Sequence, residues 1–346
     1  MILLKDQTAV ELHAALRDVG VTEKLARKLQ SLVLRQGAEI PTEVPEVSRR
    51  VLAAVRERVS IPRLQLLDKV VSPTDGFAKY LFQGDGPEPF EAVRIPLLHR
   101  PEDLKYIVCV SSQVGCALGC VFCATGRLGF RRNLATWEIV DQVLQIQADS
   151  PHPVRGVVFM GMGEPLLNYD RVIRAARVFS EPCGPAINGK AITISTVGVV
   201  PQIRRFTAEG HPYRLIVSLT SADSAQRREL LPIEQSYPLP ELFDAIREYH
   251  AATGKRVTLA WTLMSGVNTS EEHVRQLVDL IGDLPILLDL IEVNDATGRF
   301  QPPTEAELLN FRQALRNLLP MPVNRRYSGG KDIHGACGML AGVTGV

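Results

Sequence analysis

Residues 106–123 read YIVCVSSQVGCALGCVFC, and this stretch decides the fold of the 346-residue chain. The apolar, β-branched run at 106–110 predicts a buried strand, and a loop with three cysteines follows it directly. From there on, short apolar runs alternate with amphipathic helical stretches. This alternation predicts a parallel sheet, because parallel neighbours need long crossovers. The expected strands cover 106–110, 156–160, 192–197, 215–219, 256–263 and 286–293, and the expected helices cover 136–148, 169–179, 200–208, 239–252, 270–281 and 304–318.

Six strand–helix units predict an open, partial (β/α)6 barrel of the α/β class, with reactive side chains at the carboxyl ends of its strands. Thr136 is the expected N-cap of the helix over 136–148. Upstream, residues 11–37 and 46–59 have helical periodicity, and 79–96 predicts a β-hairpin that turns at Gly84-Asp85-Gly86-Pro87. The expected division is a helical accessory domain at 1–62, a linker and hairpin at 63–100, the barrel at 101–300, and a last helix with a glycine-rich tail at 301–346.

The composition is that of a globular enzyme. The net charge of +1 does not favour a nucleic-acid partner, although an RNA-binding enzyme can concentrate its cations on one face. Candidates for such a face are the arginine pairs at 131–132, 204–205, 227–228 and 325–326, and the alternative is that each pair is simply solvated beside nearby acids. No apolar run is long enough to cross a bilayer, and the N-terminus is too polar for a secretory signal. We therefore expect a cytoplasmic protein with no membrane contact.

The cysteines indicate metal and redox chemistry. Four of the six fall within 15 residues, which is not a disulfide framework for a cytosolic chain. Cys116, Cys120 and Cys123 form C-x3-C-x2-C, and three thiolates on a short loop can bind three irons of a [4Fe-4S] cluster, leaving the fourth iron open to a ligand. A zinc site usually closes with four ligands, and no partnering pair follows at zinc spacing. Buried, inert cysteines are a poor alternative on a glycine-containing loop. Cys183 has no role that the sequence assigns.

Further candidate side chains follow the expected strands. Gly163 and Glu164 lie in GMGEP, where glycine allows close backbone approach and the carboxylate can accept from an ammonium group. Ser195 and the Ser218-Leu219-Thr220 segment lie at later strand ends, where ordinary strand-end hydroxyls are the plainer interpretation. Cys109 and Cys337 lie outside the three-cysteine motif, and on sequence alone a buried Cys109 and an incidental Cys337 are the simpler reading.

The order of these motifs resembles the RlmN/Cfr family of radical S-adenosylmethionine RNA (adenine) methyltransferases. The resemblance runs from about residue 79 to 342, and the helical N-terminus is compatible with that family's accessory domain. The matching segments are CVSSQVGCALGCVFCATG, the R-x-L-x3-EI pattern at 132–139, FMGMGEPLLNYD, ITISTVGVVP and DIHGACGMLAG.

The resemblance implies the radical SAM type of partial barrel, with a [4Fe-4S] cluster and S-adenosylmethionine (SAM) as cofactors. It implies that SAM methylates Cys337, that a radical formed from a second SAM removes hydrogen from that methyl group, and that the resulting carbon radical adds to an adenine. Cys109 then attacks the sulfur of Cys337, which forms a transient disulfide and frees the product. Glu91 matches the family's proton acceptor. The cofactor contacts implied are Gly163, Glu164, Ser195, Ser218, Leu219, Thr220 and Asn294.

The substrate implied is ribosomal RNA at adenine carbon 2, with transfer RNA as a further candidate and carbon 8 as an alternative position. A non-RNA substrate for the same chemistry, or a non-catalytic binding protein, are the other hypotheses. The expected partners are RNA and an electron donor such as flavodoxin or ferredoxin, and the expected state is a monomer. This chain has Thr220, Glu292 and Met339 where the family usually has histidine, proline and glutamine.

Overall fold

The computed structural model describes residues 1–97 and 104–342, and its centre is one ten-stranded mixed sheet. Seven neighbouring strands are parallel, and three antiparallel strands extend the sheet beyond β6. The expected parallel-sheet fold is confirmed, and a short seventh strand joins the six that the sequence predicted. In sheet order the strands are β14 (Val323–Arg325), β13 (Ile286–Glu292), β12 (Val257–Leu263), β11 (Arg214–Ser218), β10 (Ile192–Thr196), β9 (Val154–Phe159), β6 (Tyr106–Cys109), β5 (Phe90–Pro96), β4 (Ala78–Gln83) and β3 (Gln65–Val71).

Helices follow the parallel strands as the sequence predicted, with ends within one residue of the expected bounds. They are α5 (Thr136–Ala148), α6 (Tyr169–Ser180), α7 (Val200–Glu209), α9 (Leu239–Thr253), α10 (Glu271–Ile281) and α11 (Glu305–Leu318), with shorter turns at α4 (Ala124–Arg127) and α8 (Ser224–Leu230). The N-cap prediction was wrong. The cap residue is Ala135, whose N–H donates to the Glu138 carboxylate at 2.7 Å, and Thr136 is already helical.

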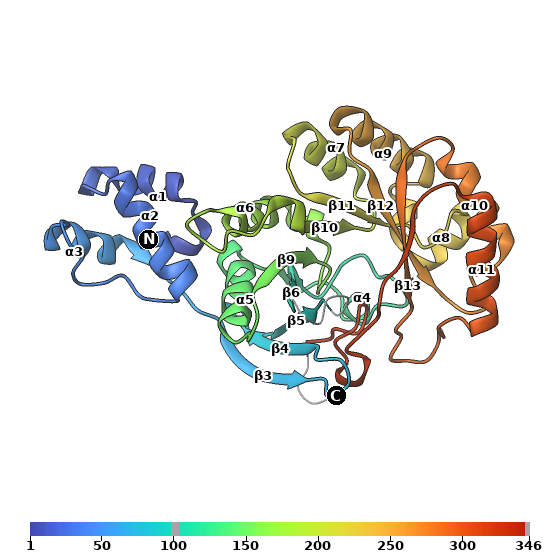
Figure 1. Ribbon diagram of the computed structural model, residues 1–346, viewed down its shortest axis with the longest axis horizontal. Coiled ribbons are helices and arrows are strands. Elements are labelled where there is room, and N and C mark those ends of the chain that lie inside the picture. The colour runs from blue at the N-terminus through green and yellow to red at the C-terminus, as the bar shows by residue number, and fades with distance from the viewer. Residues whose placement is uncertain (98–103, 343–346) are drawn as a thin grey trace.

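The N-terminal helices are α1 (Ala9–Leu16), α2 (Glu23–Gln36) and α3 (Arg49–Arg58), and they lie together at one end of the molecule (Figure 1). The helical stretch expected at 11–37 is broken, because Gly20 adopts a φ of 90° after α1 and Thr22 caps a new helix. A buried ion pair links this region to the sheet's helices, since Lys5 Nζ lies 2.5 Å from Asp141 of α5. No helix in the described part of the chain is long and apolar enough to cross a membrane.

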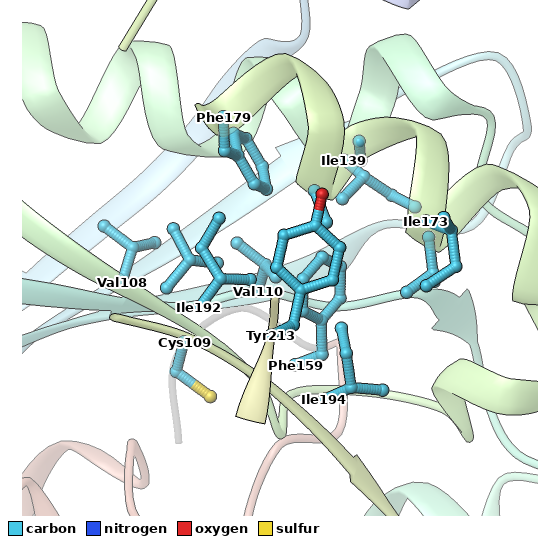
Figure 2. Packing of buried hydrophobic residues seen from close by; sticks show 14 of the residues in the cluster. Val108, Cys109, Val110, Ile139, Phe159, Ile173, Phe179, Ile192, Ile194 and Tyr213 are labelled. Carbon is cyan, nitrogen blue, oxygen red and sulfur yellow. The ribbon is translucent and has the colours of Figure 1, made fainter. Parts of the chain in front are cut away.

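The main apolar layer lies between the parallel strands and the helices α5 and α6. Val108 and Phe159 on the strands face Ile139 and Phe179 on the helices (Figure 2). Side chains alternate along a strand, so the residue after Val108 must face the other way. Figure 2 shows the sulfur of Cys109 on the opposite side of its strand from Phe179. The packing of Val108 therefore directs Cys109 toward the inner face of the sheet.

Candidate functional site

The three-cysteine loop has a backbone path that requires glycine. Gly115 has a φ of 70°, and a Cβ on it would lie 1.8 Å from the carbonyl oxygen of Gly129. The turn then holds Cys116, whose N–H donates to that same carbonyl at 3.2 Å, and Cys123 N–H donates to Cys120 O at 3.1 Å. The segment thus places three thiols on one tight turn at the start of α4.

All three thiols line one cavity at the carboxyl ends of the parallel strands. The wall is mostly apolar, with the polar side chains of Glu164, Ser195 and Ser218 among it. Of the residues proposed from the sequence, the cavity wall includes Cys116, Cys120, Cys123, Gly163, Glu164, Ser195, Ser218, Asn294 and Cys337. Four others are absent from that wall: Glu91, Cys109, Leu219 and Thr220.

Leu219 and Thr220 are fully buried behind the cavity. Thr220 has a φ of 61°, and its carbonyl accepts from Asn268 Nδ2 at 2.8 Å. That amide also donates to Thr262 O at 2.7 Å, so Asn268 fixes the backbone at the end of β11. Neither residue lines the cavity, so their contact with a ligand there stays a prediction.

The three cysteine thiols are suited to hold an iron–sulfur cluster that has a further ligand beside it. Cys116 and Cys123 both raise the pKa of Cys120, after the larger effect of burial, so the thiols lie within electrostatic reach of one another. Burial raises the pKa of Cys116 to about 12. In the described ranges, no three cysteine, histidine or carboxylate side chains lie close enough around one point to hold a single metal ion. Soft thiolates spread around an apolar cavity are the ligands that iron–sulfur clusters take.

Glu164 is a buried carboxylate in the same wall. Its two oxygens accept from the N–H groups of Leu166 and Val197, each at 3.0 Å. Gly163 before it has a φ of 98°, and a Cβ there would lie 2.5 Å from the Cβ of Gln113. Burial raises the pKa of Glu164 to about 7, although the two N–H donors act in the opposite direction. Glu164 is therefore a fixed acceptor, and its ionised form has no cationic partner among residues 1–97 and 104–342.

The free energy of unfolding of the cluster-free protein will fall, relative to Glu164→Gln, as the pH rises from 4.5 to about 7. Over this range the folded protein holds a proton on Glu164 that the unfolded chain releases, so raising the pH favours unfolding. The change approaches about 3 kcal/mol at most. Denaturant titrations of both proteins across this range measure it, and a difference between them that does not change with pH would contradict the assignment.

Arg227 supports this wall from inside the protein. It is fully buried, forms an ion pair with the equally buried Glu234, and donates to the carbonyl of Val197 at 2.7 Å. Glu234 also accepts from Leu239 N–H at 2.9 Å. Since the Val197 N–H holds Glu164, the arginine fixes the peptide segment that orients this carboxylate. Arg227 therefore does not belong to an exposed basic face, as one reading of the arginine pairs suggested.

Arg227→Met will destabilise the protein by about 3–5 kcal/mol, because it leaves the charge of Glu234 buried and unpaired. Denaturant unfolding measures the loss. Arg204→Met is the control, since the pair of Arg204 with Glu248 is half exposed and removing it costs at most about 1 kcal/mol. The double variant Arg227→Met/Glu234→Met should regain part of the loss. A cost for Arg227→Met as small as that of the control would show that Glu234 finds another partner.

The tail that carries Cys337 is held along its length. Asn294 Nδ2 donates to Cys337 O at 3.3 Å, and Ala124 N–H after the cysteine loop donates to Gly338 O at 2.7 Å. Thr125 Oγ1 donates to Leu340 O at 2.6 Å. These bonds place an accessible cysteine, Cys337, in the wall of the cavity beside the three-cysteine turn.

Glu91 on β5 holds the end of this tail. Its Oε2 accepts from the N–H groups of Ala341 and Gly342 at 2.8 and 2.9 Å, and its Oε1 lies 3.1 Å from Lys79 Nζ. Glu91 is buried and lies outside the cavity wall. The observed contacts of this carboxylate are thus structural ones to the segment that carries Cys337.

Cys109 ends β6 as a buried free thiol. Burial raises its pKa, and the neighbouring Cys337 raises it further. Desolvation by the surrounding protein also raises the pKa of Cys337. The Arg326 guanidinium, by contrast, lowers the pKa of both thiols. The structure thus brings the two cysteines within electrostatic reach of each other. Arg326 was considered only as half of the arginine pair at 325–326, and its place beside the thiols gave no sequence signal because the short strand β14 before it was not predicted.

Comparison with known proteins gives concordant matches. The model of the radical SAM superfamily matches residues 110–281. A "Probable RNA methyltransferase" of Myxococcus xanthus is 49% identical, covering 98% of this chain and 94% of its own length. A "Dual-specificity RNA methyltransferase RlmN" of Syntrophobacter fumaroxidans is 42% identical over 98% of both chains. A crystal structure of a radical SAM methyltransferase from Sphaerobacter thermophilus superposes with a TM-score of 0.89 at 34% identity, covering 99% of this chain and 100% of that one.

Proposed function

The chain belongs to the RlmN-type RNA methyltransferases of the radical SAM superfamily, and from this premise we propose that it methylates carbon 2 of an adenine in ribosomal RNA. As a member it is an enzyme that uses a [4Fe-4S] cluster and SAM, and RNA is its substrate. Transfer RNA is a second substrate in the proposal. The chain works as a monomer with a flavodoxin or ferredoxin as electron donor.

The observation that carries the proposal is the pair of free thiols, Cys109 and Cys337, beside the three-cysteine turn. A radical SAM enzyme without a methyl-carrying cysteine would need only the three-cysteine turn. A thiol that stands in the cavity wall can carry a methyl group, and a second thiol within reach can release it. The division of the chain into an accessory domain at 1–62, a linker and hairpin at 63–100, a barrel at 101–300 and a tail at 301–346 belongs to the same proposal.

Each group of site residues has a role in the proposed methyl transfer. Cys116, Cys120 and Cys123 hold the cluster, which supplies the electron that cleaves SAM to a 5′-deoxyadenosyl radical. Glu164 accepts from the ammonium group of SAM, with Gly163, Ser195, Ser218 and Asn294 lining the rest of its site and the Leu219-Thr220 backbone behind it. An ammonium there would give the buried carboxylate the charge partner it lacks.

The Cys337 thiol would first lose its proton and attack the methyl carbon of SAM, forming an S–CH3 bond and releasing S-adenosylhomocysteine. The 5′-deoxyadenosyl radical would take one hydrogen atom from this S–CH3, giving 5′-deoxyadenosine and a carbon radical that forms a bond to adenine carbon 2. The adduct would then return one electron to the oxidised cluster and give up the ring proton, for which Glu91 is the proposed acceptor. Cys109 then attacks the sulfur of Cys337, the S–C bond breaks with its electron pair on carbon, and that carbon takes a proton and leaves as the methyl group.

The test uses anaerobic protein with its cluster rebuilt, SAM, a chemical reductant and ribosomal RNA transcribed without modifications. Mass spectrometry of nucleosides reports methyladenosine, and the tryptic peptide that begins at Asp332 reports methylated Cys337. RNA made with adenine deuterated at carbon 2 loses the label if that carbon is the target. Retained deuterium in methyladenosine would move the reaction to carbon 8. If 5′-deoxyadenosine forms but the ribosomal RNA remains unmethylated, the assignment of ribosomal RNA as the substrate is overturned.

A further inference from the structure

A second, open pocket of about 550 Å³ lies beside the cavity, within the usual size range of ligand sites. Glu292 lines both, and Asn294 of the cavity donates to Ser328 Oγ of the pocket at 2.7 Å. The two hollows therefore share a wall at the end of β13. The remaining lining residues of the pocket are Thr74, Asp75, Arg325, Arg326, Tyr327, Lys331 and Asp332.

Two cations of the pocket share one carboxylate. Glu292 forms ion pairs with both Arg325 and Lys331, the latter at 3.1 Å, and the two cations are 48% and 47% exposed. Burial alone would raise the pKa of Glu292, but its bonds to Arg325 and Lys331 outweigh burial and hold it below its ordinary value. One carboxylate thus faces two cations whose remaining donors are open to an anion. Glu292 stands where the family usually has proline.

Tyr327 supplies an aromatic surface at the same place. Its side chain is 66% exposed, its hydroxyl donates to Asp75 at 3.2 Å, and its ring meets Phe77 edge-on, with centroids 6.2 Å apart and planes at 62°. The hydroxyl bond and the contact with Phe77 hold the ring in place while most of the residue stays exposed. An aromatic ring held in this way suits stacking by an unpaired nucleobase.

The pocket also carries carboxylate acceptors. Asp332 accepts from Ser72 Oγ at 2.9 Å, and Asp75 accepts from the N–H groups of Gly330 at 2.9 Å and Phe77 at 3.2 Å. A carboxylate has about four acceptor sites. Tyr327, Gly330 and Phe77 already occupy most of those of Asp75, whereas Asp332 accepts only from Ser72 and, at 3.4 Å, from Thr74 and so keeps room for a hydroxyl of the sugar. The exposed cations, the ring of Tyr327 and the Asp332 carboxylate thus match the phosphate, the base and the sugar of a nucleotide.

We propose that this pocket binds the nucleotide next to the target adenosine, with its base on the ring of Tyr327 and its phosphate on Arg325 and Lys331. This inference rests on the proposed function. A strand that inserts one base into the cavity must place the adjoining nucleotide just outside it, and the shared wall at Glu292 puts this pocket there. Base stacking and phosphate pairing tolerate any sequence, so the pocket positions the strand without reading it.

The test measures binding of a fluorescein-labelled RNA nonamer with one central adenosine among uridines, by anisotropy under anaerobic conditions. Tyr327→Ala should weaken binding about fivefold or more, and Tyr327→Phe should keep most of it, because stacking needs the ring and not the hydroxyl. Lys331→Ala should weaken binding and lower the slope of log affinity against log salt by about one. Arg275→Ala is the matched control, since Arg275 is an exposed cation paired with Glu271 on a distant helix.

A crosslink locates the nucleotide. With 4-thiouridine beside the central adenosine, irradiation should attach the RNA to the tryptic peptide of residues 327–331, and Tyr327→Ala should remove that product. Methylation of Cys337 by SAM, which needs no RNA, checks that each variant keeps its tail in place. Equal RNA affinity for Tyr327→Ala and Arg275→Ala, or a crosslink to another peptide, would contradict the proposal that this pocket binds the neighbouring nucleotide. Wild-type protein that shows the crosslink but methylates no RNA would overturn the proposed reaction and leave the pocket standing.

Discussion

Replacing Cys337 with alanine will abolish RNA methylation, with a loss of at least about a thousandfold, while cleavage of SAM to 5′-deoxyadenosine continues. Removal of a covalent nucleophile costs on this order or more, because no other group can carry the intermediate. The cluster loop keeps its own bonds in this variant, since Cys116 and Cys123 are held by Gly129 O and Cys120 O. Methyladenosine and 5′-deoxyadenosine, both quantified by mass spectrometry from one reaction, separate the two activities.

Cys183→Ala is the matched control for this variant. Cys183 is a half-buried free thiol outside the cavity wall, so its loss should change neither product. Methylated RNA from the Cys337 variant would mean that the methyl group travels directly from SAM to RNA. Loss of 5′-deoxyadenosine as well would place Cys337 in cofactor binding instead of methyl transfer.

Cys120→Ala will eliminate both products, because a cluster held by two of its three thiolates is lost or cannot transfer an electron to SAM. Iron content and the visible charge-transfer absorbance of the rebuilt protein measure this directly, without an activity assay. Cys109→Ala supplies the contrast, since Cys109 lies in β6 outside the cavity wall and should leave iron content unchanged. Full iron content in Cys120→Ala would mean that another residue supplies the third ligand.

The parallel sheet could be predicted because each strand is a short β-branched run followed by a helical stretch. Local exceptions had physical causes. Glu138 reaches back to the Ala135 N–H and so replaces the expected Thr136 cap. The edge strand β3 was missed because Gln65–Val71 is exposed along nearly all its length and shows no buried, alternating face.

The candidate site was predictable where its residues sit in one motif, such as the cysteine turn and Gly163-Glu164. It was not predictable where chemistry depends on distant contacts. Arg227 looks like half of a surface pair until Glu234 and the Val197 carbonyl enclose it. Glu91 meets Ala341 across 250 residues of sequence, a separation at which no local pattern indicates contact.

The anchoring of the tail also sets an order of events during synthesis. Gly330 binds Asp75 in the turn between β3 and β4, and Ala341 binds Glu91 on β5, so the tail docks on a part of the sheet that leaves the ribosome long before it (Figure 1). The cysteine turn at 116–123 is also translated more than 200 residues earlier than Cys337. A nascent chain thus has its proposed cluster ligands before it has the proposed methyl carrier. On this proposal, the ability to pass a methyl group to RNA arrives only when the tail joins the strands that anchor it.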